Sequence, residues 1–125
     1  MARATDCEPF GPMGSWPHMP DFDDLETRID GLCARATSEH PSARLLVEIE
    51  DLLAEGYMCA LHGDRRSRRL QSHFDALLDT ASREELRSIA LEQRVIAEAT
   101  RELRSRLAIM REHWIALGSE RLGLT

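Results

Sequence analysis

The fold of this chain is decided by residues 42–117, which read SARLLVEIEDLLAEGYMCALHGDRRSRRLQSHFDALLDTASREELRSIALEQRVIAEATRELRSRLAIMREHWIAL. Two series of uncharged residues, spaced alternately four and three apart, run through this stretch. The first is Ser42, Leu46, Ile49, Leu53, Gly56, Ala60, Gly63, Ser67, Leu70, Phe74 and Leu77. The second is Leu86, Ile89, Gln93, Ile96, Thr100, Leu103, Leu107, Met110, Trp114 and Leu117. This is the spacing of a coiled-coil seam, so it predicts two long helices, over about 42–78 and 83–117.

The two predicted helices are joined by a connection short enough to make them antiparallel neighbours. Ser82 and Glu85 form a capping box that marks the start of the second of them. Folding the chain at this connection places Gly56 opposite Leu107 and Gly63 opposite Thr100. Small residues opposite larger ones let two helices approach closely. A kink at Gly63 is the alternative interpretation of the glycines.

A shorter helix is predicted before the hairpin, over about 21–36. Asp21 is a suitable N-cap, and the residues from Thr37 to Pro41 end the helix. Its apolar stripe needs a partner, and the hairpin offers a second stripe beside each seam at its open end. We expect these stripes to contain Leu45, Leu52 and Cys59 on one helix and Ile109 and Ala116 on the other. The sequence therefore predicts an all-α three-helix bundle with a bare two-helix arm at its loop end.

The two ends of the chain are expected to add little to this bundle. Residues 1–20 hold four of the five prolines, which predicts a disordered tail. Phe10, Trp16 and Met19 leave open a second interpretation, in which the tail is a docking motif. Residues 119–125 are expected to fray, because Gly118 is a natural stop for the last helix.

Composition limits the classes of function. The chain has 125 residues, enough for one domain, and a net charge of −6, which opposes general binding of nucleic acids. Its three cysteines, Cys7, Cys33 and Cys59, have no disulfide-framework spacing, which favours a reducing compartment. No apolar run has the length of a membrane span. We therefore expect a cytoplasmic protein without membrane contact.

The densest charge feature is a cluster of arginines in the predicted arm. It consists of Arg65, Arg66, Arg68 and Arg69, joined across the hairpin by Arg94 and Arg101. One hypothesis is a patch that binds phosphate or an acidic partner. The alternative is a solvated surface neutralised by neighbouring acidic residues, namely Asp64, Glu92, Glu98 and Glu102.

The sequence offers little for catalysis or metal binding. Di-iron bundles need Glu-x-x-His motifs, and none is present. Cys59 and His62 lie one turn apart, but a zinc site needs two further ligands, and a small core residue is the competing interpretation of Cys59. There is no Gly-rich phosphate loop or nucleophile motif. We therefore expect no enzyme and assign no catalytic, cofactor or metal-binding residue.

Apolar residues off the seam of the arm suggest an interface. Leu61, Leu78, Leu91 and Val95 lie where the first helix is too short to reach. We interpret them as contacts with a second copy in a dimer, or with another helical protein; scattered surface residues are the alternative. The function expected is a non-catalytic interaction or assembly module that self-associates through its arm. The alternative is a nucleic-acid-associated or regulatory protein that uses the arginine cluster.

Overall fold

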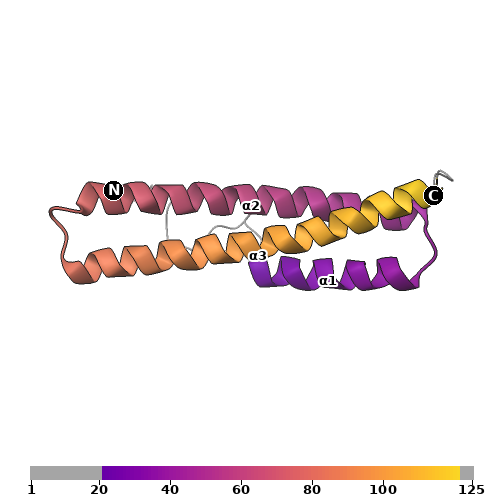
Figure 1. Ribbon diagram of the computed structural model, residues 1–125, viewed down its shortest axis with the longest axis horizontal. Helices are drawn as coiled ribbons and strands as arrows, with labels where there is room; N and C mark the ends of the chain where they lie inside the picture. The colour runs from indigo at the N-terminus through magenta and orange to yellow at the C-terminus, as the bar shows by residue number, and fades with distance from the viewer. Residues whose placement is uncertain (1–20, 122–125) are drawn as a thin grey trace, which may run out of the picture.

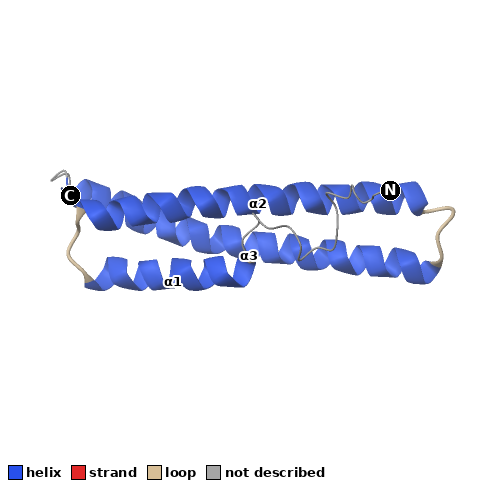
Figure 2. Ribbon diagram, turned by 180° about the vertical axis from the view of Figure 1, so that it is seen from behind, coloured by secondary structure: helices blue, strands red, loops and turns tan. Residues whose placement is uncertain are grey.

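The chain folds into three helices that confirm the predicted all-α bundle. The computed structural model describes residues 21–121, which form α1 (Phe22–Ser38), α2 (Ala43–Leu77) and α3 (Arg83–Arg121), and no strand occurs among them. Figure 1 shows α2 and α3 side by side, with α1 alongside the half of the hairpin farthest from the α2–α3 loop. The same arrangement is seen from behind in Figure 2. No helix in the described part of the chain is long and apolar enough to cross a membrane.

The predicted pairing of α2 with α3 is present. A Cβ placed on Gly56 would overlap Leu107 Cδ2 and lie 3.2 Å from Leu107 Cδ1. A Cβ placed on Gly63 would overlap Thr100 Oγ1. Because α2 continues through both glycines as one helix, we attribute them to close approach of the two backbones rather than to a break in the helix.

The buried apolar core lies entirely in the half of the hairpin that α1 covers. Its members are Leu25, Ile29, Leu32, Leu45, Ile49, Leu52, Cys59, Ala60, Leu103, Leu107, Met110 and Leu117. Phe22, at the start of α1, lies against Gly63, with its Cζ 3.3 Å from a Cβ placed there. We call residues 64–99, beyond this point, the arm. No apolar side chain of the arm is buried among the described residues.

Of the hairpin residues predicted to pack against the apolar stripe of α1, those on α2 are buried and those on α3 are not. Leu45, Leu52 and Cys59 of α2 are buried, as expected. Ile109 and Ala116 of α3 are exposed, so their assignment to the stripe was wrong. Ile109 lies two residues past a seam position, about 200° around the helix, and therefore points away from the core.

Polar contacts also hold α1 against its neighbours. On α3, Arg106 lies beside the acidic side of α1, with Nε 3.2 Å from Asp30 Oδ1 and Nη1 3.6 Å from Glu26 Oε1. Ion pairs that remain in contact with solvent contribute about 0–1 kcal/mol each, and Arg106 and Glu26 are both partly exposed. They therefore orient α1 more than they stabilise it.

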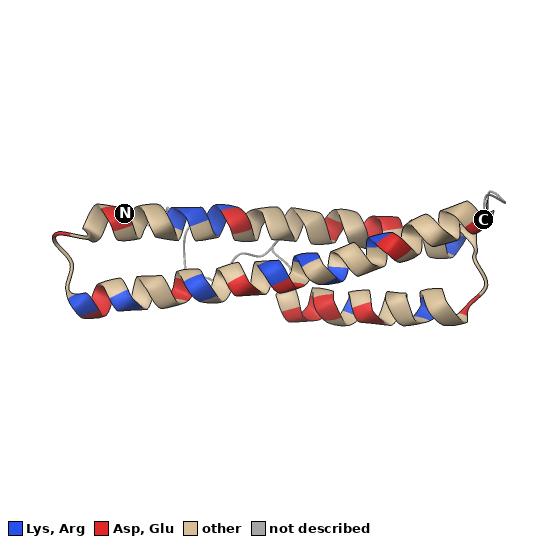
Figure 3. Ribbon diagram, viewed as in Figure 1, with Lys and Arg blue, Asp and Glu red and all other residues tan. Residues whose placement is uncertain are grey.

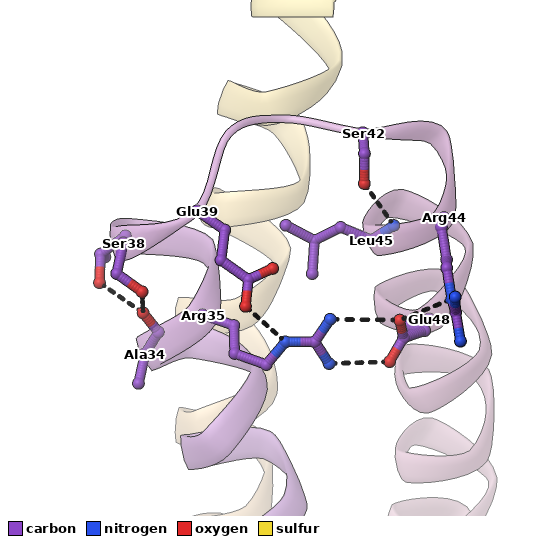
Figure 4. A network of polar contacts seen from close by, with 9 residues as sticks. Ala34, Arg35, Ser38, Glu39, Ser42, Arg44, Leu45 and Glu48 are labelled. Carbon is purple, nitrogen blue, oxygen red and sulfur yellow. Dashed lines mark hydrogen bonds and ion pairs between the residues drawn. The ribbon is translucent and has the colours of Figure 1, made fainter.

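Two arginines of α1 reach glutamates of α2. Figure 4 shows the Arg35 guanidinium donating to both carboxylate oxygens of Glu48, at 2.9 and 3.3 Å, beside the Ser42 cap of α2. Arg28 donates in the same way to Glu55, at 2.9 Å for both contacts. These hydrogen bonds lower the pKa of each glutamate below its ordinary value of 4.5. Their stabilisation of the docked helix is therefore present above that value and is lost as the pH falls below it.

The predicted start of α3 is correct, and its predicted end is not. Ser82 Oγ accepts from the Glu85 amide and Glu85 Oε1 accepts from the Ser82 amide, at 3.1 and 3.0 Å, which completes the capping box. At the other end α3 runs through Gly118 to Arg121 instead of stopping at Gly118. A glycine inside a helix costs only about 1 kcal/mol, and the buried Leu117 holds this last turn on the core. Residues 1–20 and 122–125, including the proposed docking motif, lie outside the described residues.

The close approach at Gly56 can be tested with a single methyl group. We expect Gly56→Ala to lower the free energy of unfolding by about 1–3 kcal/mol, because the new Cβ overlaps a fully buried leucine. The matched control is Gly31→Ala on α1, where a Cβ meets nothing within 4 Å. Removing that glycine should stabilise the protein by about 0.5–1 kcal/mol. Urea denaturation of both variants measures the two effects, and equal shifts would contradict the close approach.

Candidate functional site

The side chains that flank the seam of the hairpin are divided between two faces. On α2 the positions one residue before the seam, such as Leu45, Leu52 and Cys59, are buried against α1. On α3 the corresponding position of Arg106 contacts α1 as well. In each helix, the position one residue after a seam residue lies about 100° around the helix axis from it, on the side away from α1. We call the face that these positions form, opposite α1, the uncovered face.

The seam of the arm is only partly closed. Its apolar side chains are half-buried, in contrast to the covered half, where most seam residues are buried. A small cavity of about 80 Å³ lies between the two helices of the arm, lined by Leu70, Gln71, Phe74, Ile89, Ala90 and Gln93. Two helices alone cannot enclose a dry core, so the arm leaves part of its apolar surface in contact with solvent.

The four residues assigned to an interface are all exposed, but they do not share one surface. Leu91 and Val95 are 57% and 56% exposed and lie one turn apart on the outer side of α3. Leu61 follows a seam residue of α2 and therefore belongs to the uncovered face. Leu78 lies at the loop end of the hairpin. The pair formed by Leu91 and Val95 is thus the coherent part of the predicted interface.

The arginine cluster is divided by the fold. Arg66 does not face solvent: it is 9% exposed, and its Nη2 lies 2.5 Å from Glu92 Oε2 on the side of the arm that continues the track of α1. Its Nε is buried without a hydrogen-bond partner. The assignment of Arg66 to a surface patch was therefore wrong, because its position before the seam turns it inward. Arg69, like the remaining members of the cluster, is exposed.

Two of the four acidic residues expected to neutralise the cluster pair with arginines outside it. Arg104 takes Asp64, at 2.7 Å between Nη2 and Oδ2, and Arg106 takes Glu102. Arg66 takes Glu92. The arginines that stay exposed, with no ion pair to any described residue, include Arg65, Arg68, Arg94 and Arg101. The alternative of a neutralised surface is thus weakened for this part of the arm, which Figure 3 shows with its charges.

A groove runs along the uncovered face where the covered half meets the arm. It has a volume of about 510 Å³ and is lined by Asp64, Ser67, Ala97, Thr100, Arg101, Arg104, Ser105 and Ala108. Most of these side chains are small, and two are arginines. Sequence reasoning missed Arg104, Ser105 and Ala108 as functional candidates. The signal that could have found this face is the heptad spacing of Arg87, Arg94, Arg101, Ala108 and Ile115 along α3.

Reactive groups are few in the described part of the chain. No three His, Cys, Asp or Glu side chains between residues 21 and 121 are grouped as metal ligands would be. Cys59 belongs to the buried core beneath α1, and burial raises the pKa of its thiol to about 11. A thiol with such a pKa is protonated at neutral pH and is a poor nucleophile or metal ligand.

Comparison of the chain with protein-family models, with curated proteins and with solved structures finds no match. We therefore infer a function from the surface of the bundle.

The buried ion pair between Arg66 and Glu92 can be tested by removing one charge or both. We expect Glu92→Gln to lower the free energy of unfolding by about 1–3 kcal/mol, because a nearly buried guanidinium loses its counter-charge. The partial exposure of Glu92 keeps the effect below that of a fully buried pair. The control Arg66→Met with Glu92→Met removes both charges and should lie within about 1 kcal/mol of the parent. Thermal and urea denaturation measure both, and a larger loss in the double variant would contradict the interpretation.

Proposed function

We propose that this protein is a non-catalytic assembly module that associates with a second copy of itself through its arm. The observation that supports this function is the distribution of the core: among residues 21–121, every buried apolar residue lies in the covered half. The arm continues for several turns beyond that core with its apolar seam half-buried. Helices of this length derive most of their stability from tertiary packing rather than from intrinsic propensity. A second arm would provide that packing.

The outer surface of the arm also favours an apolar contact. Leu91 and Val95 form an exposed apolar pair one turn apart on α3. An exposed charge, Glu98, lies about one turn from Val95 on the same helix, so the apolar pair is bounded by a polar residue. Most homo-oligomers are two-fold dimers in which the same patch meets itself. The arm, with its exposed pair, suits such an isologous contact.

A second function is favoured by the exposed arginines of the arm. Arg68, Arg94 and Arg101 are exposed and have no ion pair with a described residue. A surface of this kind attracts phosphate groups, and its affinity for nucleic acid would fall steeply with added salt. The net charge of −6 acts against it at long range.

Self-association is tested by introducing charge into the apolar pair. We expect Leu91→Glu with Val95→Glu to convert a dimer into a monomer at micromolar concentration, because the paired arms would bury four like charges. The matched control is Ile109→Glu, on the same side of α3 about five turns further along and also about half exposed, but outside the arm. Light scattering at several protein and salt concentrations measures the mass. A parent that is monomeric throughout would overturn the proposal, as would a double variant that stays dimeric.

The alternative function is tested on a heparin column. If the arginines of the arm bind polyanions, Arg94→Gln with Arg101→Gln should elute at clearly lower salt than the parent. The control, Arg44→Gln with Arg111→Gln, removes the same charge from the other end of the hairpin. Equal elution of the two variants would leave no role for the arginines of the arm in anion binding.

A further inference from the structure

The uncovered face of the hairpin has a graded chemistry along its length. The register of α2 and α3 places the positions after the seam level with one another in successive layers. One set of these layers, from the open end toward the loop, is Val47 with Ile115, Ala54 with Ala108, Leu61 with Arg101, and Arg68 with Arg94. All eight of these side chains are exposed. A second, mainly polar set alternates with it and includes Glu50 with Arg111, Tyr57 with Arg104, and Asp64 with Ala97. The first set changes from apolar through small to basic over about 30 Å.

The covered half of the hairpin is closed on one face and open on the other. Beneath α1, Leu45, Leu52 and Cys59 are buried, whereas the seam residues Leu46 and Leu53 are only partly buried. Because α1 shields its own face, the exposure of these seam residues lies toward the uncovered face. The hairpin thus has the surface for a second packed helix on the side opposite α1.

The middle of this face is shaped for close packing. The groove of about 510 Å³ has Ser67, Ala97, Ser105 and Ala108 among its lining residues. Small side chains let a further helix approach to the lower end of the usual interaxial distance of about 8–10 Å. Thr100 is nearly buried beneath them, so the groove has a closed floor.

The arginines at and beside the groove indicate the charge of the helix that would bind there. Arg101 is exposed at the rim, and Arg68 and Arg94 form the next layer. The acidic residue of the groove, Asp64, already pairs with Arg104 at 2.7 Å. We propose that the uncovered face binds an amphipathic helix of another protein, with apolar residues against Val47 and Ile115 and acidic residues against the three arginines. Charge complementarity then fixes where along the hairpin the helix lies.

This site differs from the contact proposed for self-association. Leu91 and Val95 lie on the outer side of α3 and line no part of the groove. A dimer formed through that pair leaves the groove accessible. The two proposals can therefore fail separately, since one is measured by mass and the other by peptide binding.

The experiment uses a fluorescent peptide of about three heptads, with Leu and Ala on one face and Glu flanking that face in its last two turns. Its anisotropy is measured against the full-length protein. We expect binding that a scrambled peptide of the same composition does not show. Ala108→Trp, which fills the groove from an exposed position, should weaken binding by about tenfold or more. Ser105→Trp is a second blocking variant, and Ala34→Trp on α1 is the matched control.

The contribution of the arginines to peptide binding is tested with a separate variant. Arg101→Glu should weaken peptide binding by about tenfold, and Arg44→Glu, with the same change in net charge, should not. Circular dichroism establishes that each variant keeps its helices. The proposal is overturned if the peptide does not bind, or if both tryptophan variants bind it as the parent does. It is also overturned if a DNA duplex competes and responds to Arg101→Glu but not to Ala108→Trp, because the surface would then be a nucleic-acid site.

Discussion

The contact on which the rest of the structure depends is the close approach of α2 and α3 at Gly56 and Gly63. At both positions the space for a Cβ is already filled by a side chain of α3, Leu107 in one case and Thr100 in the other. A shift of either helix by one residue would drive larger side chains into these gaps. The glycines therefore hold the register of the hairpin, and the register decides which residues share each face.

The unequal lengths of the helices produce the second main feature. α1 covers the hairpin from its open end as far as Gly63, where Phe22 begins the helix. Beyond that point the positions that would meet α1 carry a charged pair instead, Arg66 with Glu92. A charged pair in the track of a core stripe marks the end of the bundle, because burying it further would require partners for the rest of the guanidinium. The arm is what remains of the hairpin without a third helix.

The interface residues show where sequence reasoning was sufficient and where it was not. An apolar residue that lies off the seam and is not covered by α1 must be exposed, and the sequence predicted this for Leu61, Leu78, Leu91 and Val95. Leu91 and Val95 adjoin by their spacing on one helix, but where they lie relative to Leu61 and Leu78 depends on how α2 and α3 pack against each other. The arginine cluster was wrong at one member, because four neighbours along a helix point in four directions and Arg66, next to the seam, turns inward.

The number of helices, the antiparallel hairpin, the seam pairing and the capped start of α3 could all be predicted from the sequence. These follow from local spacing, because hydrophobic periodicity and capping act within a few turns of one helix. Which flank of the hairpin α1 covers, and hence which flank is left as a groove, became clear from the packing of the three helices. The exposure of Ile109 and the continuation of α3 through Gly118 also depend on packing between elements far apart in the chain. The hydrophobic period of a sequence determines which residues form the apolar stripe of each helix. The side on which a third helix packs depends on the surface that the other two helices form together.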